Sequence, residues 1–420
     1  MNFVHASDFH LGYVQYGLSE RFRDFARAFD RVVDYTIQSD AEFLLIAGDL
    51  FHKRNINAPT YLQAFKILTK LADREIPVYV IEGNHDLAYQ RDVNSWLQIL
   101  DAQGLLRLIK LKPMPECGVK LMGDFVDVGG VRIFGVKYLG SQTRNAVPDI
   151  AGEIERVNEI AGKPDYTILM MHFGMEGILS TSGIGELAYN SLVLLRDSVD
   201  YLALGHYHVQ YDRDGWIFNG GSCEMVSMSE HNKPKGFYHV VDGKASFQKA
   251  TPRPVERFGI DASGTQSISD LYGSIRSAVD GISRRDAKPL VEISVHGELL
   301  FSRTDISIEK IREIVSSILD PLWTNVKITD TKEPLSYSPD GPTRRDVIER
   351  SVIEEVVKGS QYRSHTNDVV DTIIEAKQLA ITGIDSQSIF YRLQDSYNAV
   401  KRKHKGQADL PFERGCADVD

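Results

Sequence analysis

The 420-residue sequence contains few cysteines and lacks a long apolar run. Its three cysteines, Cys117, Cys223 and Cys416, form no CxxC pair, which argues against a disulfide-stapled secreted scaffold and a cysteine zinc site. Its apolar runs fall short of the roughly 20 residues that span a bilayer. The first residues, MNFVHASDFH, form neither a signal peptide nor an amphipathic targeting segment. We therefore expect a soluble, intracellular, cytoplasmic protein without membrane association.

Basic residues are also in deficit, with 48 lysines and arginines against 58 aspartates and glutamates, for a formal charge of -10. Proteins that bind nucleic acid over their whole surface are usually basic, so this balance argues against that class. It does not exclude a nuclease, because bound metal ions or a basic partner can supply positive charge. The chain length predicts two or three domains.

The first 250 residues alternate compact apolar runs with amphipathic segments. Apolar runs followed by glycine or polar residues are typical of buried strands, and Phe22, Phe25 and Phe29 recur at helical spacing. This pattern predicts an α/β sandwich. We expect strands at 3–6, 43–47, 78–81, 131–136, 167–171, 201–204, 216–218 and 237–241, the last two antiparallel, and helices around 22–33, 62–71 and 150–160.

The pattern restarts near residue 255 as helix, strand, helix, strand, which predicts a small α+β domain over 251–330. A linker rich in proline and turn-forming residues follows at 331–344. Residues 345–405 contain three helical segments that either pack on the main body or dock on another protein, and 406–420 form a polar tail. The expected elements are helices at 268–282, 308–319, 346–357, 367–381 and 387–404, and strands at 290–295 and 325–329.

Five short polar motifs directly follow five of the expected strands in the first half. Functional groups of open α/β sheets gather beyond the carboxyl ends of strands, so these motifs should converge. Their carboxylates, imidazoles and carboxamide suit divalent metals, and five in this order indicate a site for two ions that polarise a phosphate. The motifs are Asp8-Phe9-His10, Gly48-Asp49, Gly83-Asn84-His85-Asp86, His172 and Gly205-His206-Tyr207-His208.

The order of these motifs resembles the calcineurin-like metallophosphoesterase superfamily, whose metal-binding positions all have counterparts here. The resemblance implies a β-sandwich flanked by helices and two bound metal ions. One ion would be held by Asp8, His10, Asp49 and His208. The other would be held by Asn84, His172, His206 and again Asp49, the bridging ligand.

Two further residues of the third motif have expected roles. The resemblance implies that His85 is catalytic: it contacts the reacting phosphate and assists the leaving oxygen, which suits an imidazole. The alternative is that His85 only shapes the turn. Asp86 either orients His85 or caps a following helix, and we expect the cap.

The stretch GDLFH at residues 48–52, together with DFHLG and EGNHD, is similar to the SbcD-type, Mre-eleven-like nucleases of DNA double-strand-break repair. The similarity implies that His52 positions a DNA strand over the metals, while Lys53 and Arg54 could contact neighbouring phosphates. Otherwise all three are ordinary loop residues. The implied activity is that of a 3′-to-5′ exonuclease and single-strand endonuclease with Mn²⁺ as the expected metal. The ligand set itself also suits iron, cobalt or zinc.

The similarity extends to the layout of the chain. It implies a nuclease domain over 1–250, a capping, DNA-binding domain over 251–330, and a segment at 345–405 that docks on an ATP-hydrolysing coiled-coil partner of the SbcC or Rad-fifty kind. It also implies action at the nucleoid and a homodimer. The helices expected to form the dimer carry Tyr61, Leu62 and Phe65, and Trp96, Leu97 and Leu100; alternatively they pack on their own sheet.

Two other functions stay open. A small-molecule phosphoesterase, such as a cyclic-nucleotide phosphodiesterase, would use the same metals but would not need His52, Lys53 and Arg54 or the additional domains. A DNA-tethering scaffold with a regulatory site would not need an intact ligand set. The sequence has the 52–54 stretch with the additional domains, and it also has the intact ligand set, so it favours the nuclease.

Overall fold

The computed structural model describes residues 1–89, 92–113, 121–123, 125–179, 186–282, 287–330, 349–350, 353–354, 357, 365–381, 390 and 393–394. The chain divides into two compact units, Met1–Lys332 and Glu333–Asp420. Among the described residues, every helix is too short or too polar to cross a membrane.

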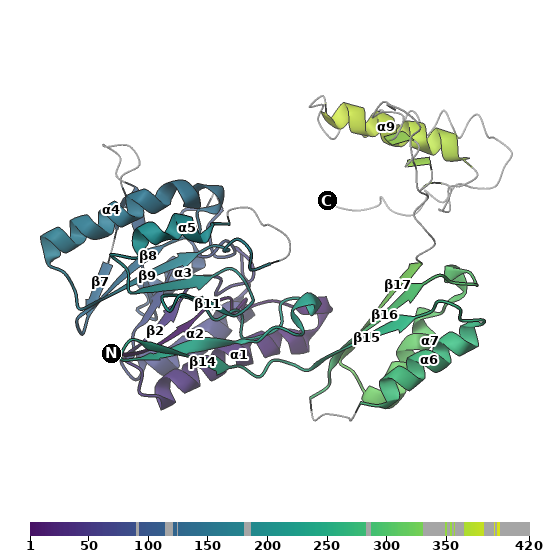
Figure 1. The fold of residues 1–420 in the computed structure, drawn as a ribbon, viewed down its shortest axis with the longest axis horizontal. Coiled ribbons are helices and arrows are strands. Elements are labelled where there is room, and N and C mark those ends of the chain that lie inside the picture. Colours follow the sequence, from purple (N-terminus) through teal and green to yellow (C-terminus); the bar gives the residue numbers. More distant parts are fainter. Residues whose placement is uncertain are drawn as a thin grey trace. The chain divides into compact units, whose positions relative to one another are not determined.

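The first of two six-stranded sheets has the strand order β14-β13-β1-β2-β3-β4. Figure 1 labels two of its strands, β2 and β14. Strands β1 to β4 are parallel, whereas β13 pairs antiparallel with both β1 and β14. The strands are β1 (Asn2–Ala6), β2 (Phe43–Ile46), β3 (Val78–Val80), β4 (Arg107–Leu108), β13 (Gly236–Val241) and β14 (Lys244–Lys249). The connecting helices are α1 (Ser19–Gln38), α2 (Ala58–Ala72) and α3 (Trp96–Ala102).

The second sheet has the order β11-β12-β10-β9-β8-β7 and packs against α4 and α5. Its strands are β7 (Phe125–Val128), β8 (Val131–Val136), β9 (Tyr166–His172), β10 (Tyr201–Gly205), β11 (Tyr211–Arg213) and β12 (Ile217–Asn219). The helices are α4 (Thr143–Ala161) and α5 (Tyr189–Leu192), and a separate pair is formed by β5 (Leu111–Pro113) and β6 (Leu121–Gly123). Strand β12 pairs parallel with β10, so the antiparallel expectation for residues 216–218 holds only toward β11.

The side chains of a strand alternate between the two faces of its sheet, and this explains how the two large sheets share a core. Phe3 of β1 belongs to the apolar cluster between the sheets, while its neighbour Val4 belongs to the cluster beneath α1. Because successive side chains of a strand point to opposite faces, a strand covered on both faces must be apolar throughout. The continuous apolar runs of the sequence therefore lie in the middle of the fold, and the α/β fold predicted from them is confirmed.

Residues 255–330 form a third sheet with a separate core. Its three strands are parallel in the order β15-β16-β17, and α6 and α7 pack with them around apolar side chains. The elements are β15 (Val255–Asp261), α6 (Ile268–Asp280), β16 (Leu290–Gly297), α7 (Ile308–Leu319) and β17 (Trp323–Asp330). The expectation that this region begins with a helix is wrong, because β15 precedes α6.

In the second unit, α9 (Thr366–Ile381) matches the helix expected at 367–381. The helices expected at 346–357 and 387–404 lie largely outside the described residues, although residues 349–350, 353–354, 357, 390 and 393–394 are helical. The linker at 331–344 and the tail at 406–420 lie outside the described residues.

Candidate active site and metal centre

The five motifs converge where the carboxyl ends of strands from both large sheets meet. Strands β1, β2 and β3 of the first sheet precede three motifs, whereas β9 and β10 of the second sheet precede the other two. The seven side chains predicted to bind metal lie in contact with one another across this edge. They are Asp8, His10, Asp49, Asn84, His172, His206 and His208.

One group of donors consists of Asp8, His10 and His208, whose candidate ligand atoms lie within 4.8 Å of one another. The Nε2 atoms of His10 and His208 are 3.0 Å apart. The Nε2 atom of His208 also lies 3.9 Å from Oδ1 of Asp8. A carboxylate oxygen and two imidazole nitrogens at this spacing suit one divalent ion.

A second group contains Asp8, Asp49 and His172, again with ligand atoms within 4.8 Å. Nε2 of His172 is 3.3 Å from Oδ2 of Asp49 and 3.2 Å from Oδ1 of Asn84. The Asn84 oxygen is in turn 3.0 Å from Nδ1 of His206. By distance the two groups share Asp8, whereas the resemblance assigns the bridge to Asp49. This donor set fits two adjacent ions.

The backbone of the site is strained at four of these residues. The φ angles of Asp8, His10, Asp49 and His206 are 55°, 49°, 53° and 91°. These values lie in the left-handed region of backbone conformation, which residues other than glycine rarely adopt. Such conformations cost about 1–3 kcal/mol each and persist only where the surroundings enforce them. Strain concentrated at the predicted ligands is therefore a mark of a functional site.

Two glycines allow the ligand loops to approach so closely. A Cβ on Gly48, whose φ is 90°, would lie 2.4 Å from Nδ1 of His172. A Cβ on Gly83 would lie 2.1 Å from Oδ1 of Asp49. Any larger residue at either position would displace a predicted ligand.

Hydrogen bonds outside the donor groups orient several ligands. The Nδ1–H of His172 donates a hydrogen bond to the carbonyl oxygen of Ala47 at 2.7 Å. The other ring nitrogen, Nε2, is therefore the atom that faces the metal site. Asp8 accepts from the Ser7 hydroxyl at 2.5 Å and from the His206 amide at 3.1 Å. Both arrangements fix the side chains before any ion arrives.

The electrostatics keep two of the imidazoles neutral, the form that binds metal. Burial, together with the neighbouring His208, lowers the pKa of His10 well below its ordinary value. Burial and the charge of His172 lower the pKa of His206 to about 3. Burial also disfavours a charged His172, but attraction to Asp49 outweighs it and raises the pKa of His172 to about 9.

The helix-capping role expected for Asp86 is wrong. It does not cap a helix, because it ends a turn, residues 87–89 after it are not helical, and α3 is capped by Ser95. Instead, its buried carboxylate accepts hydrogen bonds from the amides of Leu50, Phe51 and Gly83. Burial and the nearby Asp49 raise the pKa of Asp86 to about 8. Asp86 ties the loop after β2 to the loop after β3.

His85 and His52 lie beside the predicted ligands. The Nδ1–H of His85 donates to the backbone oxygen of His52 at 2.7 Å, and the rings of His10 and His85 are 5.0 Å apart. The His52 ring stacks on Tyr13 with 3.8 Å between ring centres. Burial and the charge of His85 lower the pKa of His52 to about 4.

The two basic residues after His52 are both exposed. The Nε of Arg54 donates to the backbone oxygen of Asn84 at 3.3 Å, and its guanidinium lies 5.7 Å from the ring centre of Tyr89. Arg54 is therefore held beside a predicted ligand, while its charge stays accessible. Lys53 shares this exposed edge.

Several contributors were not identified from the sequence. Ser7, Tyr13, Glu230 and Lys235 contact site residues, but none lies in a motif that polarity or spacing alone would single out. The signal that could have found Ser7 is its adjacency to Asp8. Tyr13, Glu230 and Lys235 reach the site through the folding of the chain.

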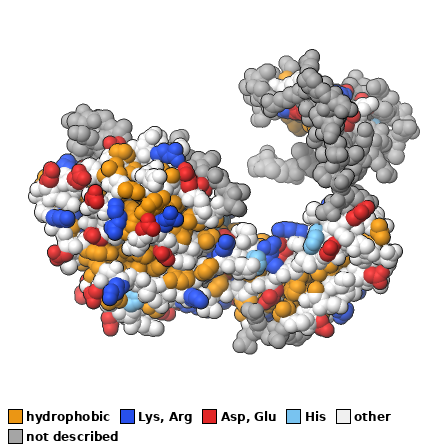
Figure 2. All heavy atoms as spheres, in the orientation of Figure 1, with side chains coloured by type: hydrophobic (Ala, Val, Ile, Leu, Met, Phe, Trp, Pro, Cys, Tyr) orange, Lys and Arg blue, Asp and Glu red, His pale blue; other side chains and the backbone are white. Residues whose placement is uncertain are grey.

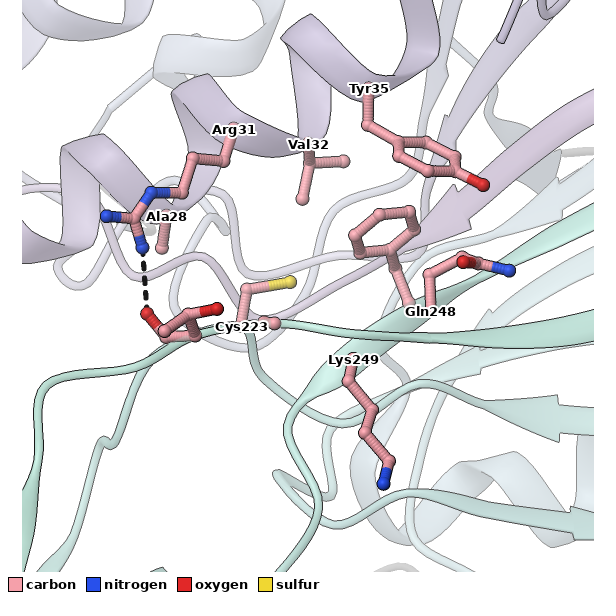
Figure 3. A pocket seen from close by; sticks show the side chains of 10 residues that line it. Ala28, Arg31, Val32, Tyr35, Cys223, Gln248 and Lys249 are labelled. Atoms are coloured by element: carbon pink, nitrogen blue, oxygen red, sulfur yellow. Dashed lines mark hydrogen bonds between the residues drawn. The ribbon is translucent and has the colours of Figure 1, made fainter.

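A further pocket is lined by residues of α1 and of the chain around Cys223 and β14. Figure 3 shows it between α1 and the β13–β14 hairpin, with Cys223 at its wall and Arg31 bonded to the Thr251 oxygen. Burial raises the pKa of the Cys223 thiol to about 12, so it is not a ready nucleophile. The pocket includes none of the predicted site residues.

The α/β sandwich, with polar donors gathered beyond its strand ends, defines the calcineurin-like class of phosphoesterases. The sequence profile of the calcineurin-like phosphoesterase family matches residues 1–210. This family uses a dinuclear metal site, and the described residues supply three overlapping donor groups for one, the third being His10, His52 and His85.

Similarity to individual proteins narrows the assignment within this family. The chain is 31% identical over 349 residues to the DNA double-strand break repair protein Mre11 of Archaeoglobus fulgidus, with 76% of each chain covered. It is 29% identical to Mre11 of Haloferax volcanii, covering 70% of this chain and 62% of that one. Identity to Mre11 of Saccharolobus solfataricus is 24%, over 89% and 93% of the two chains. The chain belongs to the calcineurin-like phosphoesterase family and, within it, to the Mre11-type proteins.

Proposed function

We propose that this chain is the nuclease subunit of a DNA double-strand-break repair complex and hydrolyses DNA phosphodiesters. The observation that carries the proposal is the convergence of the seven candidate ligands, four of them residues with positive φ, with His85 beside them. The printed name of the relatives, DNA double-strand break repair protein Mre11, supports the substrate and the process.

The proposed ligands of two divalent ions fall into two sets. Asp8, His10, Asp49 and His208 hold one ion, and Asp49, Asn84, His172 and His206 hold the other. When bound, the ions supply the positive charge that polarises the scissile phosphate and activates a water. We propose Mn²⁺ as the native metal, because mixed oxygen and nitrogen donors accept it and the family resemblance favours it.

His85 is the proposed catalytic acid. Its Nδ1–H is already donated to the His52 oxygen, so the ring is held and Nε2 is the atom left for the reaction. A proton on Nε2 can pass to the leaving oxygen of the DNA backbone, a role worth about 10²–10⁴ in rate. His85 need not bind metal for this purpose.

The three residues after β2 at positions 52–54 are proposed to hold the DNA strand. His52, stacked on Tyr13, positions the strand over the site, and the exposed cations of Lys53 and Arg54 contact neighbouring phosphates. Local attraction of this kind fits a chain of net charge -10. In the view of Figure 2, basic and acidic side chains are interspersed over the phosphoesterase part.

The same proposal covers the layout of the chain. Residues 1–250 form the nuclease domain, 251–330 the capping, DNA-binding domain, 331–344 a linker and 406–420 a tail. In the sheet β15-β16-β17, Arg257 and Lys327 both pair with the buried Glu292, so two cations share one carboxylate on this face. Residues 345–405 dock on an ATP-hydrolysing coiled-coil partner of the SbcC or Rad-fifty kind, and the assembly acts inside the cell at the nucleoid.

A homodimer through α2 and α3 is also proposed. Leu62, Phe65 and Ile99 are exposed on these helices, and Tyr61 packs 5.8 Å from Trp96, ring to ring. Exposed apolar groups on adjacent helices suit a contact across a two-fold axis. Leu97 and Leu100, also named from the sequence, are fully buried in the protomer and therefore do not contribute to that surface.

The test is incubation of metal-stripped protein with end-labelled linear DNA, with and without Mn²⁺, beside an Asp49→Ala variant. Degradation should require Mn²⁺ and fall about 10²–10³-fold in the variant, because the proposed shared ligand of the two ions is lost and with it their charge at the scissile phosphate. Labels at the 3′ and 5′ ends report the polarity, for which we propose 3′-to-5′ exonuclease action with single-strand endonuclease activity. Turnover of cyclic nucleotides without degradation of DNA would instead support a small-molecule phosphodiesterase.

A DNA-tethering scaffold is the other alternative. It predicts that the Asp49→Ala variant fully restores repair in cells that lack the protein. Failure of that variant to restore repair, together with loss of its nuclease activity, supports the enzyme.

A further inference from the structure

Glu230 and Lys235 are two buried, oppositely charged residues beside the site that the proposed mechanism does not use. Glu230 is 8% exposed and Lys235 is 4% exposed. Glu230 ends a short 3-10 helix, η4 (Met228–Glu230), and Lys235 immediately precedes β13 of the first sheet. His208, which both residues contact, follows β10 of the second sheet.

The contacts form a clamp on His208. Oε1 of Glu230 accepts a hydrogen bond from Nδ1–H of His208 at 3.0 Å. Oε2 of Glu230 accepts from Nζ of Lys235 and from the Val226 amide. Lys235 Nζ also donates to the backbone oxygen of His208 and to the Ser222 hydroxyl, each at 2.8 Å. The three donors of the ammonium group are therefore all used, two of them on His208 or its partner.

Stability gives no sufficient reason for this arrangement. Taking two charges out of water is costly, and a buried ion pair is often no more stabilising than apolar residues of the same volume. What the pair does provide is a fixed imidazole. Because a carboxylate can only accept, the Nδ1 atom of His208 carries the proton and Nε2 presents its lone pair to Asp8 and His10.

His172 provides an internal comparison. Its Nδ1–H is held by a neutral carbonyl oxygen, that of Ala47, whereas His208 is held by a carboxylate. A carboxylate partner makes an imidazole a stronger donor to a metal, and loss of such a partner commonly weakens affinity about 10–100-fold. The neighbouring lysine satisfies the carboxylate and holds the backbone of the same histidine.

We infer that Glu230 and Lys235 are positioning residues that fix the tautomer and orientation of His208 and so set the affinity of the ion at Asp8, His10 and His208. This inference rests on the proposed function, because it takes His208 to be a metal ligand. Neither residue touches the substrate. Their effect passes through one ligand and therefore falls on one of the two ions.

The test is titration of metal-stripped protein with Mn²⁺, with free Mn²⁺ followed by electron paramagnetic resonance. The parent should bind two ions, and Glu230→Gln should weaken one of them about 10–100-fold while leaving the other within about threefold. The matched control is Glu153→Gln on α4, since Glu153 is 7% exposed and ion-paired with Arg156. It should bind both ions as the parent does.

Failure of this inference can be separated from failure of the proposed function. If the parent does not bind two ions, or if His208→Ala binds them as the parent does, the ligand assignment fails. If the parent and His208→Ala behave as expected but folded Glu230→Gln binds both ions normally, only the positioning role is overturned.

A second measurement reports the tautomer directly. In metal-free protein labelled with ¹⁵N-histidine, the His208 signal, assigned by its loss in His208→Gln, should be that of the Nδ1–H form. In Glu230→Gln it should move toward a mixture of tautomers, which a purely structural role would not produce. An Nε2–H form in the parent would overturn the inference.

Lys235→Met gives a third test, because residues that act as a unit have non-additive effects. The double variant Glu230→Gln/Lys235→Met should lose no more affinity for the ion than the more affected single variant, within about threefold. Losses that multiply would overturn the joint role. Circular dichroism identifies a variant that does not fold, and the result for Glu230→Gln then stands alone.

Discussion

Residues 1–250 and 255–330 both contain parallel strands joined by helices, yet they use the ends of those strands differently. In the first region, Asp8, Asp49 and His206 follow strands in strained conformations and converge. In the second region, Asp261 and His296 lie side by side at the ends of β15 and β16 with ordinary backbone. Within the described part of that region, the one non-glycine residue with positive φ is Asp320, after α7.

The difference shows what a site requires beyond a fold. Parallel strands bring their carboxyl ends to one edge in both regions, but only loops that bend sharply turn several donors toward one point. The first region supplies that bending at residues where it costs stability, and glycines permit the close approach. Fold alone would not distinguish the two regions.

The largest effect within this comparison is expected from His85→Asn. Hydrolysis should fall about 10²–10⁴-fold because the proposed acid is lost, while Mn²⁺ binding stays at two ions. The matched control is His296→Gln, a histidine at a strand end of the second region, which should stay within about twofold of the parent. Rates on labelled DNA and Mn²⁺ titration check both, and loss of an ion from His85→Asn would contradict its role.

A pair of glycine substitutions tests the contrast in backbone geometry. Gly48→Ala should destabilise the fold by about 1–3 kcal/mol and disrupt metal binding, since its Cβ would meet His172 and its φ is positive. Gly273→Ala, within α6 and facing open space, should stabilise by roughly 0.5–1 kcal/mol. Chemical denaturation measures both. Equal effects at the two positions would remove the proposed difference between the regions.

A residue of the site could be predicted from the sequence when it directly follows an apolar strand. All seven proposed ligands and His85 do, so apolar runs and polar motifs were enough to nominate them. Glu230 and Lys235 were missed because they lie in a segment with no periodic pattern, and their contacts with His208 span 22 and 27 residues. Asp86 was misassigned because an aspartate before a helix is usually a cap, whereas here it joins two loops.

The fold was predicted in outline for a similar reason. Buried strands such as β8 are apolar throughout and were located closely. Strand β15, with the sequence VERFGID, has three charged residues among seven and no strict alternation of polar and apolar residues, so it was not predicted as the first strand of the third sheet. Its one parallel partner strand, β16, lies 35 residues further along the chain, which the local pattern does not reveal.

A smaller effect is expected where the two regions touch. Tyr16, three residues after Tyr13, stacks on Trp323 with ring centres 3.7 Å apart. Trp323→Ala should lower degradation of long DNA about two- to tenfold, in line with an aromatic pair worth about 0.5–1.5 kcal/mol, and leave a small phosphodiester unaffected. Tyr16→Phe keeps the ring and should match the parent. An equal drop on both substrates would mean that the stack supports the site itself.

The prediction with the smallest effect near neutral pH compares a histidine inside a strand with those beyond its end. Burial lowers the pKa of His5 to about 3, so below about pH 6.5 the unfolded chain binds a proton that the folded chain does not. The free energy of unfolding should therefore fall as pH drops from about 6.5 toward 3, by up to about 1.4 kcal/mol per pH unit for this proton. His5→Gln should flatten that slope in metal-free denaturation; an unchanged slope would contradict the assignment.

The central claim is that the strand ends of the first region hold two ions. Its most direct test is a crystal structure grown with Mn²⁺ and measured at the manganese absorption edge. The account predicts two anomalous peaks, one among Asp8, His10 and His208 and one among Asn84, His172 and His206, both beside Asp49. A single peak, or peaks on other residues, would contradict it.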